Sequence, residues 1–101
     1  MLFMRTATIS PGRFAEAMSF AREISSHIES KAGVKVRVFT QIGGIAGRLA
    51  WQAEFKNLGA YDEFLGRFVT DAGYQEIIKK AAPLFIEGET HDSLWMEPPQ
   101  K

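Results

Sequence analysis

Three arginines, a glutamine and a histidine are the residues of this chain whose chemistry best suits a binding site. Guanidinium groups bind carboxylates and phosphates through paired hydrogen bonds, and histidine titrates near neutral pH. All five residues fall in segments with the alternating pattern of strands, at positions predicted to share one sheet face. They are our candidate ligand-binding residues: Arg5, Arg37, Arg48, Gln52 and His91. His91 is also the one candidate for a catalytic role.

Each candidate also has a structural interpretation, which we favour. A histidine on a strand is more often structural or exposed to solvent than catalytic. The arginines can pair with Glu54 and Glu89 across a subunit interface, because buried charges need partners before they need ligands. Trp51 and Trp95 could stack on a flat ligand, but aromatic residues in strands usually belong to the core.

Several other classes of site are excluded by the sequence pattern. The glycines of segment 43–47 lack a following Lys-Ser or Lys-Thr and lead into a strand, so they predict a turn rather than a phosphate loop. His27 and His91 have no carboxylate or second histidine at ligand spacing, and we expect no metal. His27 is predicted to be a surface residue of a helix. The absence of cysteine excludes disulfides, thiolate zinc sites and a cysteine nucleophile.

The length and the net charge of the chain limit the type of protein and the partners that we expect. With 101 residues the chain predicts a single domain, 1–101. Twelve basic and twelve acidic residues give no net charge, so nucleic acid and anionic membrane surfaces are not expected as partners. No apolar run approaches the roughly 20 residues of a membrane-spanning helix, and the first residues lack a signal-peptide pattern. We expect a soluble, cytoplasmic protein.

The elements that must position the candidate residues follow from periodicity and from capping residues. Strands are predicted over 2–9, 34–39, 48–55 and 87–96. Ser10 and Pro11 predict a helix start and Gly33 a helix end. Asn57 predicts the start of a second helix, which breaks near Asp71 and Gly73 before resuming to residue 82.

This βαββαβ order predicts an α+β, ferredoxin-like fold, in which helices cover one face of a four-stranded antiparallel sheet. We assign apolar residues to the uncovered face as well: Phe3, Ile9, Phe39, Ala50 and Trp95. Monomers seldom leave such a patch in water. We therefore expect a homodimer that pairs through its sheet faces, as in a dimeric α+β barrel.

The segment Met4-Arg5-Thr6-Ala7-Thr8-Ile9-Ser10-Pro11-Gly12 resembles the opening strand and turn of the NIPSNAP family, a branch of the dimeric α+β barrel superfamily. Gln41-Ile42-Gly43, Trp51, Asp71-Ala72-Gly73-Tyr74 and Ala82-Pro83-Leu84 are similar to later parts of that family's layout. The resemblance extends over most of the chain, and its motifs are short and structural rather than catalytic.

The resemblance implies a homodimeric, cofactor-free module that is structural or binds a small, partly apolar molecule. An enzymatic alternative is open at this point: a cofactor-independent monooxygenase acting on a small aromatic or polyketide-like substrate. The second helix lacks a histidine for haem iron and the first strand lacks an asparagine, and both features argue against the oxygen chemistry of the superfamily's enzymes.

Overall fold

The computed structural model describes residues 1–44 and 46–99, in which strands and helices follow one another in the predicted order. The elements are β1 (Leu2–Ile9), α1 (Phe14–Ala32), β2 (Arg37–Thr40), β3 (Arg48–Glu54), α2 (Leu58–Val69), α3 (Ala72–Ile78), the short 3-10 helix η1 (Lys79–Ala81) and β4 (Phe85–Trp95). Among these described residues, no helix is both long and apolar enough to cross a membrane.

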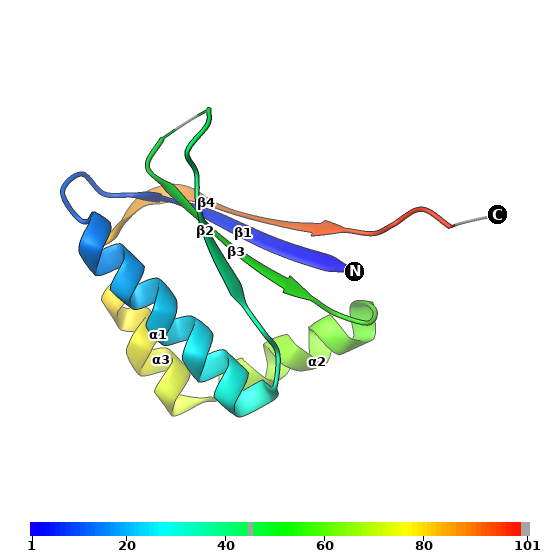
Figure 1. Cartoon of the computed structure of the whole chain (residues 1–101). Coiled ribbons are helices and arrows are strands. Elements are labelled where there is room, and N and C mark those ends of the chain that lie inside the picture. The colour runs from blue at the N-terminus through cyan, green and yellow to red at the C-terminus, as the bar shows by residue number, and fades with distance from the viewer. Residues whose placement is uncertain (45, 100–101) are drawn as a thin grey trace.

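The strands form one antiparallel sheet in the order β2-β3-β1-β4. All the helices lie on the same side of this sheet (Figure 1). The predicted ferredoxin-like α+β fold is confirmed. We call the two sides of the sheet the helix-covered face and the open face.

Strand register assigns each side chain to a face, because directly paired residues point to the same side of a sheet. Four rows of paired residues lie on the helix-covered face: Val38–Trp51–Arg5–Asp92, Thr40–Leu49–Ala7–Thr90, Ala53–Phe3–Leu94 and Ile9–Phe85. Four rows lie on the open face: Arg37–Gln52–Met4–Ser93, Phe39–Ala50–Thr6–His91, Glu54–Leu2–Trp95 and Arg48–Thr8.

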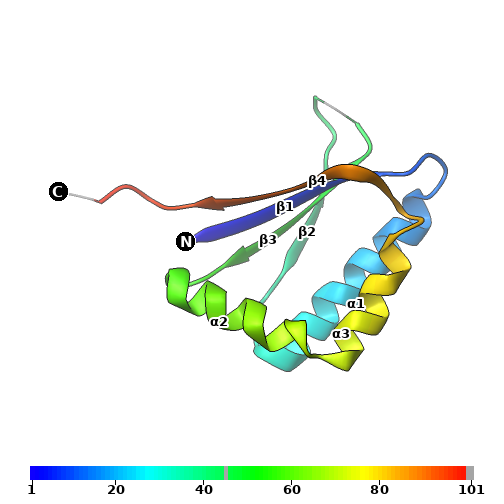
Figure 2. The same ribbon diagram turned by 180° about the vertical axis from the view of Figure 1, so that it is seen from behind.

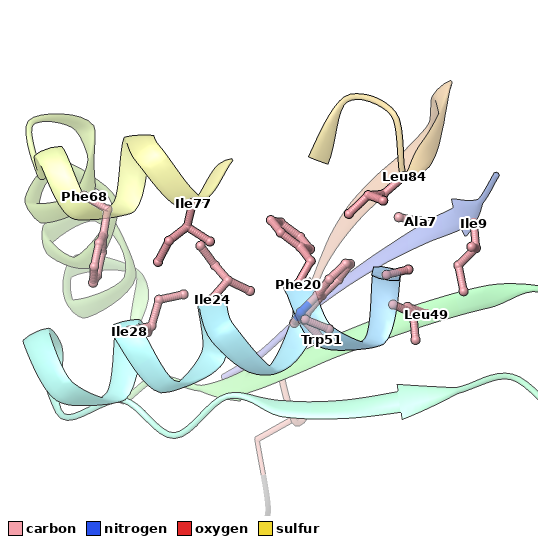
Figure 3. Close-up of a cluster of buried hydrophobic side chains, with 12 residues drawn as sticks. Ala7, Ile9, Phe20, Ile24, Ile28, Leu49, Trp51, Phe68, Ile77 and Leu84 are labelled. Atoms are coloured by element: carbon pink, nitrogen blue, oxygen red, sulfur yellow. The ribbon is translucent and has the colours of Figure 1, made fainter. Parts of the chain in front are cut away.

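The core fills the space between the helix-covered face and α1, with Trp51 near its centre (Figure 3). The indole meets Phe20 of α1 edge-on at a centroid distance of 6.3 Å and Phe85 of β4 at 5.8 Å. Leu49, two positions before Trp51, has no exposed surface. The predicted inward alternation of β3 is therefore confirmed.

Two of the five apolar residues assigned to the open face lie on the helix-covered face instead. The ring of Phe3 stacks on Tyr61 of α2 at 5.5 Å, and Ile9 is 8% exposed within the core. β1 carries apolar residues on both faces, so its own alternation could not show which face the helices cover. The prediction for Phe39, Ala50 and Trp95 agrees with the strand register.

The helix ends show why the chain changes direction where it does. Gly33 ends α1 at φ 67°, a left-handed conformation that favours glycine, and its N–H donates to the carbonyl of Glu29. The Asn57 side chain accepts the N–H of Ala60 and caps α2. Asp71 caps α3 in the same way, through the N–H of Tyr74. These three predicted boundaries are confirmed.

The predicted start of α1 at Ser10 and Pro11 is wrong. The helix begins at Phe14, after a turn in which the N–H of Arg13 donates to the carbonyl of Ser10 at 3.0 Å. Two features oppose an earlier start. Gly12 has φ 79°, outside the helical region, and the N–H of Ser10 donates to the carbonyl of Leu84, which ties Ser10 to the chain just before β4.

The fully buried position of Leu49 leads to a stability prediction. We expect Leu49→Ala to lower the free energy of unfolding by about 2–5 kcal/mol, because the surrounding core cannot close the cavity that the substitution leaves. Leu58→Ala, at a position that is 57% exposed, is the matched control and should change the free energy by less than about 0.5 kcal/mol. Urea unfolding of the three proteins measures both values; equal losses would contradict the assigned core.

Candidate functional site

A cavity of about 100 Å³ lies between the helix-covered face and the helices α1, α2 and α3. Its wall is mainly aromatic and apolar, and the aromatic residues include Phe3, Phe20, Trp51, Phe55, Tyr61 and Phe64. Apolar cavities with a few polar groups are the usual form of small-molecule sites. This cavity is the candidate site, and it lies on the side of the sheet opposite to the one that sequence reasoning favoured.

Among the described residues that line this cavity, Arg5 carries the only permanent charge. Its Nε–H donates to Oδ1 of Asp92 at 2.6 Å and its Nη2–H to Oδ2 at 2.9 Å. The hydrogen bond to Asp92 raises the pKa of Arg5 above its usual value, so the guanidinium stays charged. Together the two side chains form a neutral pair beside the cavity.

The predicted placement of Arg5 on the open face is therefore wrong, and its carboxylate partner comes from β4 of the same chain. The register pairs Arg5 with Trp51 on one side and with Asp92 on the other, and all three side chains lie on the helix-covered face. The pairing joins residues 87 positions apart in the chain. No local pattern around Arg5 indicates that partner.

Two tyrosines add hydroxyl groups to the cavity wall. Tyr61 comes from α2 and Tyr74 from α3. Burial raises the pKa of Tyr61 above 10.0, and the nearby Asp92 carboxylate acts in the same direction. Tyr61 is therefore a neutral hydroxyl at physiological pH, which donates or accepts a hydrogen bond but does not act as a base.

Trp51 has a buried polar atom without a partner, a feature that sequence reasoning missed. Its Nε1 is fully shielded from solvent and has no hydrogen-bond partner among the described residues. Within the same part of the chain, Ser25 Oγ is the other buried side-chain atom without a partner, but Ser25 does not line the cavity. Tryptophan N–H groups usually find an acceptor when they are buried. The sequence shows only a tryptophan at a core position, with no sign that its N–H lacks a partner.

The four predicted site residues other than Arg5 lie on the open face. Arg37 and Gln52 are directly paired and line a hollow of about 250 Å³ with Lys35 and Glu54. The Arg37 guanidinium lies 5.1 Å from the ring centroid of Phe39. Of the five predicted site residues, Arg37 and Gln52 are the two that the fold brings together.

His91 and Arg48 do not join that pair. His91 is exposed on β4 and paired with Thr6 of β1, so two strands separate it from β2. Arg48 stands at the first position of β3 and donates from Nε to the side-chain oxygen of Gln41 at 2.7 Å. Their roles as ligand-binding residues, and the catalytic role of His91, stay predictions.

His27 is not the simple surface residue that the sequence predicts. Its Nε2 lies 2.5 Å from Oδ2 of Asp71, and its ring lies against Gly73, where an added Cβ would come within 2.6 Å of His27 Cε1. The same Asp71 oxygen accepts the backbone N–H of Tyr74, which lines the cavity. This contact therefore holds the start of α3 against α1 beside the candidate site.

Comparisons with known proteins agree with this architecture. The NIPSNAP family model matches residues 2–98. No curated protein matches the chain. Among solved structures, the chain resembles an uncharacterized NIPSNAP domain protein from Burkholderia xenovorans, with a TM-score of 0.82 and 17% identity over 97% of this chain and 95% of that chain.

Two further solved structures have a similar fold. A NIPSNAP family protein with unknown function from Agrobacterium tumefaciens has a TM-score of 0.77 and 17% identity, over 91% of this chain and 82% of that chain. A protein from Deinococcus radiodurans that is described as an antibiotic biosynthesis monooxygenase has a TM-score of 0.69 and 15% identity, over 100% of this chain and 98% of that chain. At these identities the likeness concerns the fold alone.

The contact between His27 and Asp71 predicts a dependence of stability on pH. The hydrogen bond from His27 lowers the pKa of Asp71 below 3.8 in the folded protein, and the bond from the Tyr74 N–H adds to the effect. A carboxyl group with a lowered pKa stabilises the fold above its ordinary pKa, and this contribution is lost as the pH falls through the folded value. Asp71→Asn keeps a capping oxygen without the charge, so its unfolding free energy should fall less steeply below about pH 4.

Urea unfolding between about pH 6 and pH 2 measures this difference in slope. Asp62→Asn, at an exposed position on α2, is the matched control and should follow the unmodified protein. Parallel curves for the Asp71 variant and the unmodified protein would show that the pair adds nothing to stability.

Proposed function

The chain belongs to the NIPSNAP family, and we propose that it acts as a homodimer that binds a small, largely apolar molecule in the cavity between its sheet and its helices. The aromatic cavity is the observation that carries this proposal. Its volume of about 100 Å³ is below the ~150 Å³ of an engineered protein cavity that takes up benzene. This volume therefore sets an upper limit of one small ring for the ligand.

The composition of the wall supports binding through apolar contact. Phe55 contacts both Tyr61 and Phe64 at centroid distances of 5.3 and 5.0 Å, which gives the cavity a closely packed aromatic side. Burial of apolar surface contributes about 25 cal/mol per Å², so a small ring enclosed on several sides gains useful affinity. Because Asp92 neutralises Arg5, the site does not require a charged ligand.

The open face supports the homodimer. Phe39 is 40% exposed and Trp95 is 60% exposed, at opposite edges of the sheet. Aromatic side chains of this kind bury on the order of 150–250 Å² each. Between them lie the smaller and polar residues of the open-face rows, so a second sheet can approach closely there. In this arrangement Arg37, Gln52 and His91 are interface residues.

The enzymatic alternative, a cofactor-independent monooxygenase, rests on the fold shared with the Deinococcus radiodurans protein. That protein is 15% identical to this chain, so the shared fold supports a similar architecture and no specific chemistry. Binding is the function that we propose, because the cavity itself supports it. Measurement of oxygen uptake with quinol substrates tests the alternative. Turnover in the unmodified protein that is lost in the Ala53→Leu variant would favour a monooxygenase.

The homodimer predicts a specific effect of a charge at the centre of the open face. Ala50 lies on β3 in the row of Phe39 and Thr6, and Ala50→Glu would place an unpaired carboxylate between the two sheets. We expect the dimer to weaken by about 2 kcal/mol or more, roughly a 30-fold higher dissociation constant. Sedimentation equilibrium measures this constant.

Ser19→Glu, at an exposed position of α1, adds the same charge on the far side of the molecule and should leave the dimer intact. A folded monomer of the unmodified protein at micromolar concentration would contradict the homodimer.

The cavity predicts a second, independent effect. Ala53 is buried at 4% exposure and lines the cavity, so Ala53→Leu would fill part of its volume. We expect the affinity for fluorobenzene, followed by fluorine NMR, to fall by about tenfold or more. Ala50→Leu adds the same atoms on the open face and should retain the affinity, because neighbouring strand positions point to opposite faces. Equal affinities for all three proteins would place the probe outside this cavity.

A further inference from the structure

We infer that the cavity binds neutral molecules that carry a hydroxyl group on an apolar body, and that this hydroxyl contacts Arg5, Asp92 and Tyr74. This inference rests on the proposed binding function and assigns the chemical class of the ligand for the same site. Three observations carry it: the pair of Arg5 and Asp92 lies where the cavity meets solvent, tyrosine hydroxyls approach this pair from the helices, and the cluster combines donors with acceptors.

Arg5 marks the part of the cavity that is open to solvent. It lines the cavity, yet its side chain is 38% exposed, and the side chain of its partner Asp92 is 43% exposed. Other residues of the wall, such as Phe20 and Ile24, are each only 5% exposed. A bound molecule can therefore place its apolar part among buried side chains and keep a polar group beside the ion pair.

The charged end of Arg5 lies in the layer between the sheet and the helices. Its Cζ is 5.9 Å from the ring centroid of Phe3, which stacks on Tyr61 of α2 at 5.5 Å. The hydrogen bond to Asp92 is the main cause of the raised pKa of Arg5, and the hydroxyl of Tyr74 in α3 acts in the same direction. Burial raises the pKa of Tyr61, Asp92 raises it further and Arg5 opposes the rise. Both tyrosine hydroxyls are thus close enough to interact with the pair.

These side chains offer donors and acceptors together. A guanidinium has more N–H groups than the two that Arg5 gives to Asp92, and each oxygen of Asp92 that accepts one of these bonds has a further lone pair. A tyrosine hydroxyl both donates and accepts. A ligand hydroxyl can therefore accept from Arg5 and donate to Tyr74 at the same place. A methyl group there would displace water without replacing its hydrogen bonds.

The ion pair also disfavours charged ligands. A carboxylate that approaches Arg5 meets the like charge of Asp92, and an ammonium group that approaches Asp92 meets the like charge of Arg5. Either ligand would have to separate the pair to gain a full counter-charge. A hydroxyl group leaves the pair in place.

Three probes with one ring each test this inference by fluorine NMR: 4-fluorophenol, 4-fluorotoluene and 4-fluorobenzoate. At neutral pH the first two are uncharged and the third is an anion. The phenol and the toluene differ only in a hydroxyl group against a methyl group, so the ratio of their dissociation constants measures the preference for the hydroxyl. We expect the benzoate to bind about tenfold or more weakly than the phenol.

Variants of the contacting residues should change this preference. Arg5→Met combined with Asp92→Leu removes the pair without leaving an unpaired charge, and Tyr74→Phe removes one hydroxyl. Dividing the ratio in each variant by the ratio in the unmodified protein cancels the different hydration of the two probes. We expect the preference for the phenol to fall by about tenfold in the double variant and by about threefold in Tyr74→Phe.

A second ion pair of the chain provides the matched control. Arg13 and Glu16 pair at 2.9 Å, are exposed to a similar degree and are not among the described residues that line the cavity. Arg13→Met combined with Glu16→Leu should therefore leave the preference for the phenol unchanged.

The outcomes separate this inference from the proposed function. Saturable binding of both neutral probes with the same ratio in all the proteins would overturn the hydroxyl site and leave cavity binding intact. Tighter binding of 4-fluorobenzoate than of 4-fluorophenol would have the same meaning. If neither neutral probe binds, the proposed cavity binding is wrong as well. If the double variant does not fold, the ratio in Tyr74→Phe decides.

Discussion

The pairing of β1 with β3 at the centre of the sheet is the constraint on which the rest of the structure depends. Arg5 stands directly opposite Trp51, so both side chains point toward the helices. A shift of one residue would turn Gln52 into the core and Trp51 out of it. Because Leu49, Trp51 and Ala53 must all be buried, a shift of one residue is excluded, and the observed register places Arg5 beside the cavity.

The cavity follows from the way the helices cover this face. Figure 2 shows α1 and α3 side by side, with α2 crossing below the strands at an angle to them. The change of direction falls at Asp71, whose carboxylate caps α3 and contacts His27 of α1. A single long helix would lack this bend. The aromatic residues of α2 and the side chains of α3 therefore meet around a space that neither helix fills.

The two faces of the sheet suit different partners. The helix-covered face holds a partly open, aromatic space in which polar groups are few and Arg5 is already paired with Asp92. The open face carries exposed aromatic residues at its edges and mixed charges between them, which suits a flat and extensive contact with a second copy. In our proposal one face recognises a small molecule and the other recognises the same chain. Because Ala50 and Ala53 are three positions apart in β3 and point to opposite faces, substitutions at the two positions act on different functions.

The sequence by itself determined the local features of this protein. The alternation of Leu49, Trp51 and Ala53, the left-handed end of α1 at Gly33 and the caps at Asn57 and Asp71 each depend on a few neighbouring residues. The order of these elements was enough to predict the ferredoxin-like sheet. The start of α1 was missed because a bond from Ser10 to distant Leu84 overrides the local capping pattern.

Only the tertiary structure decided where the candidate site lies. β1 is apolar on both faces, so its orientation depends on the register with β3 and on the helices that cover one side. The partners Asp92 of Arg5 and Asp71 of His27 are 87 and 44 positions away in the chain, and the unpaired N–H of Trp51 results from the whole of its surroundings. Contacts of this kind leave no periodic signal, because packing between distant segments creates them.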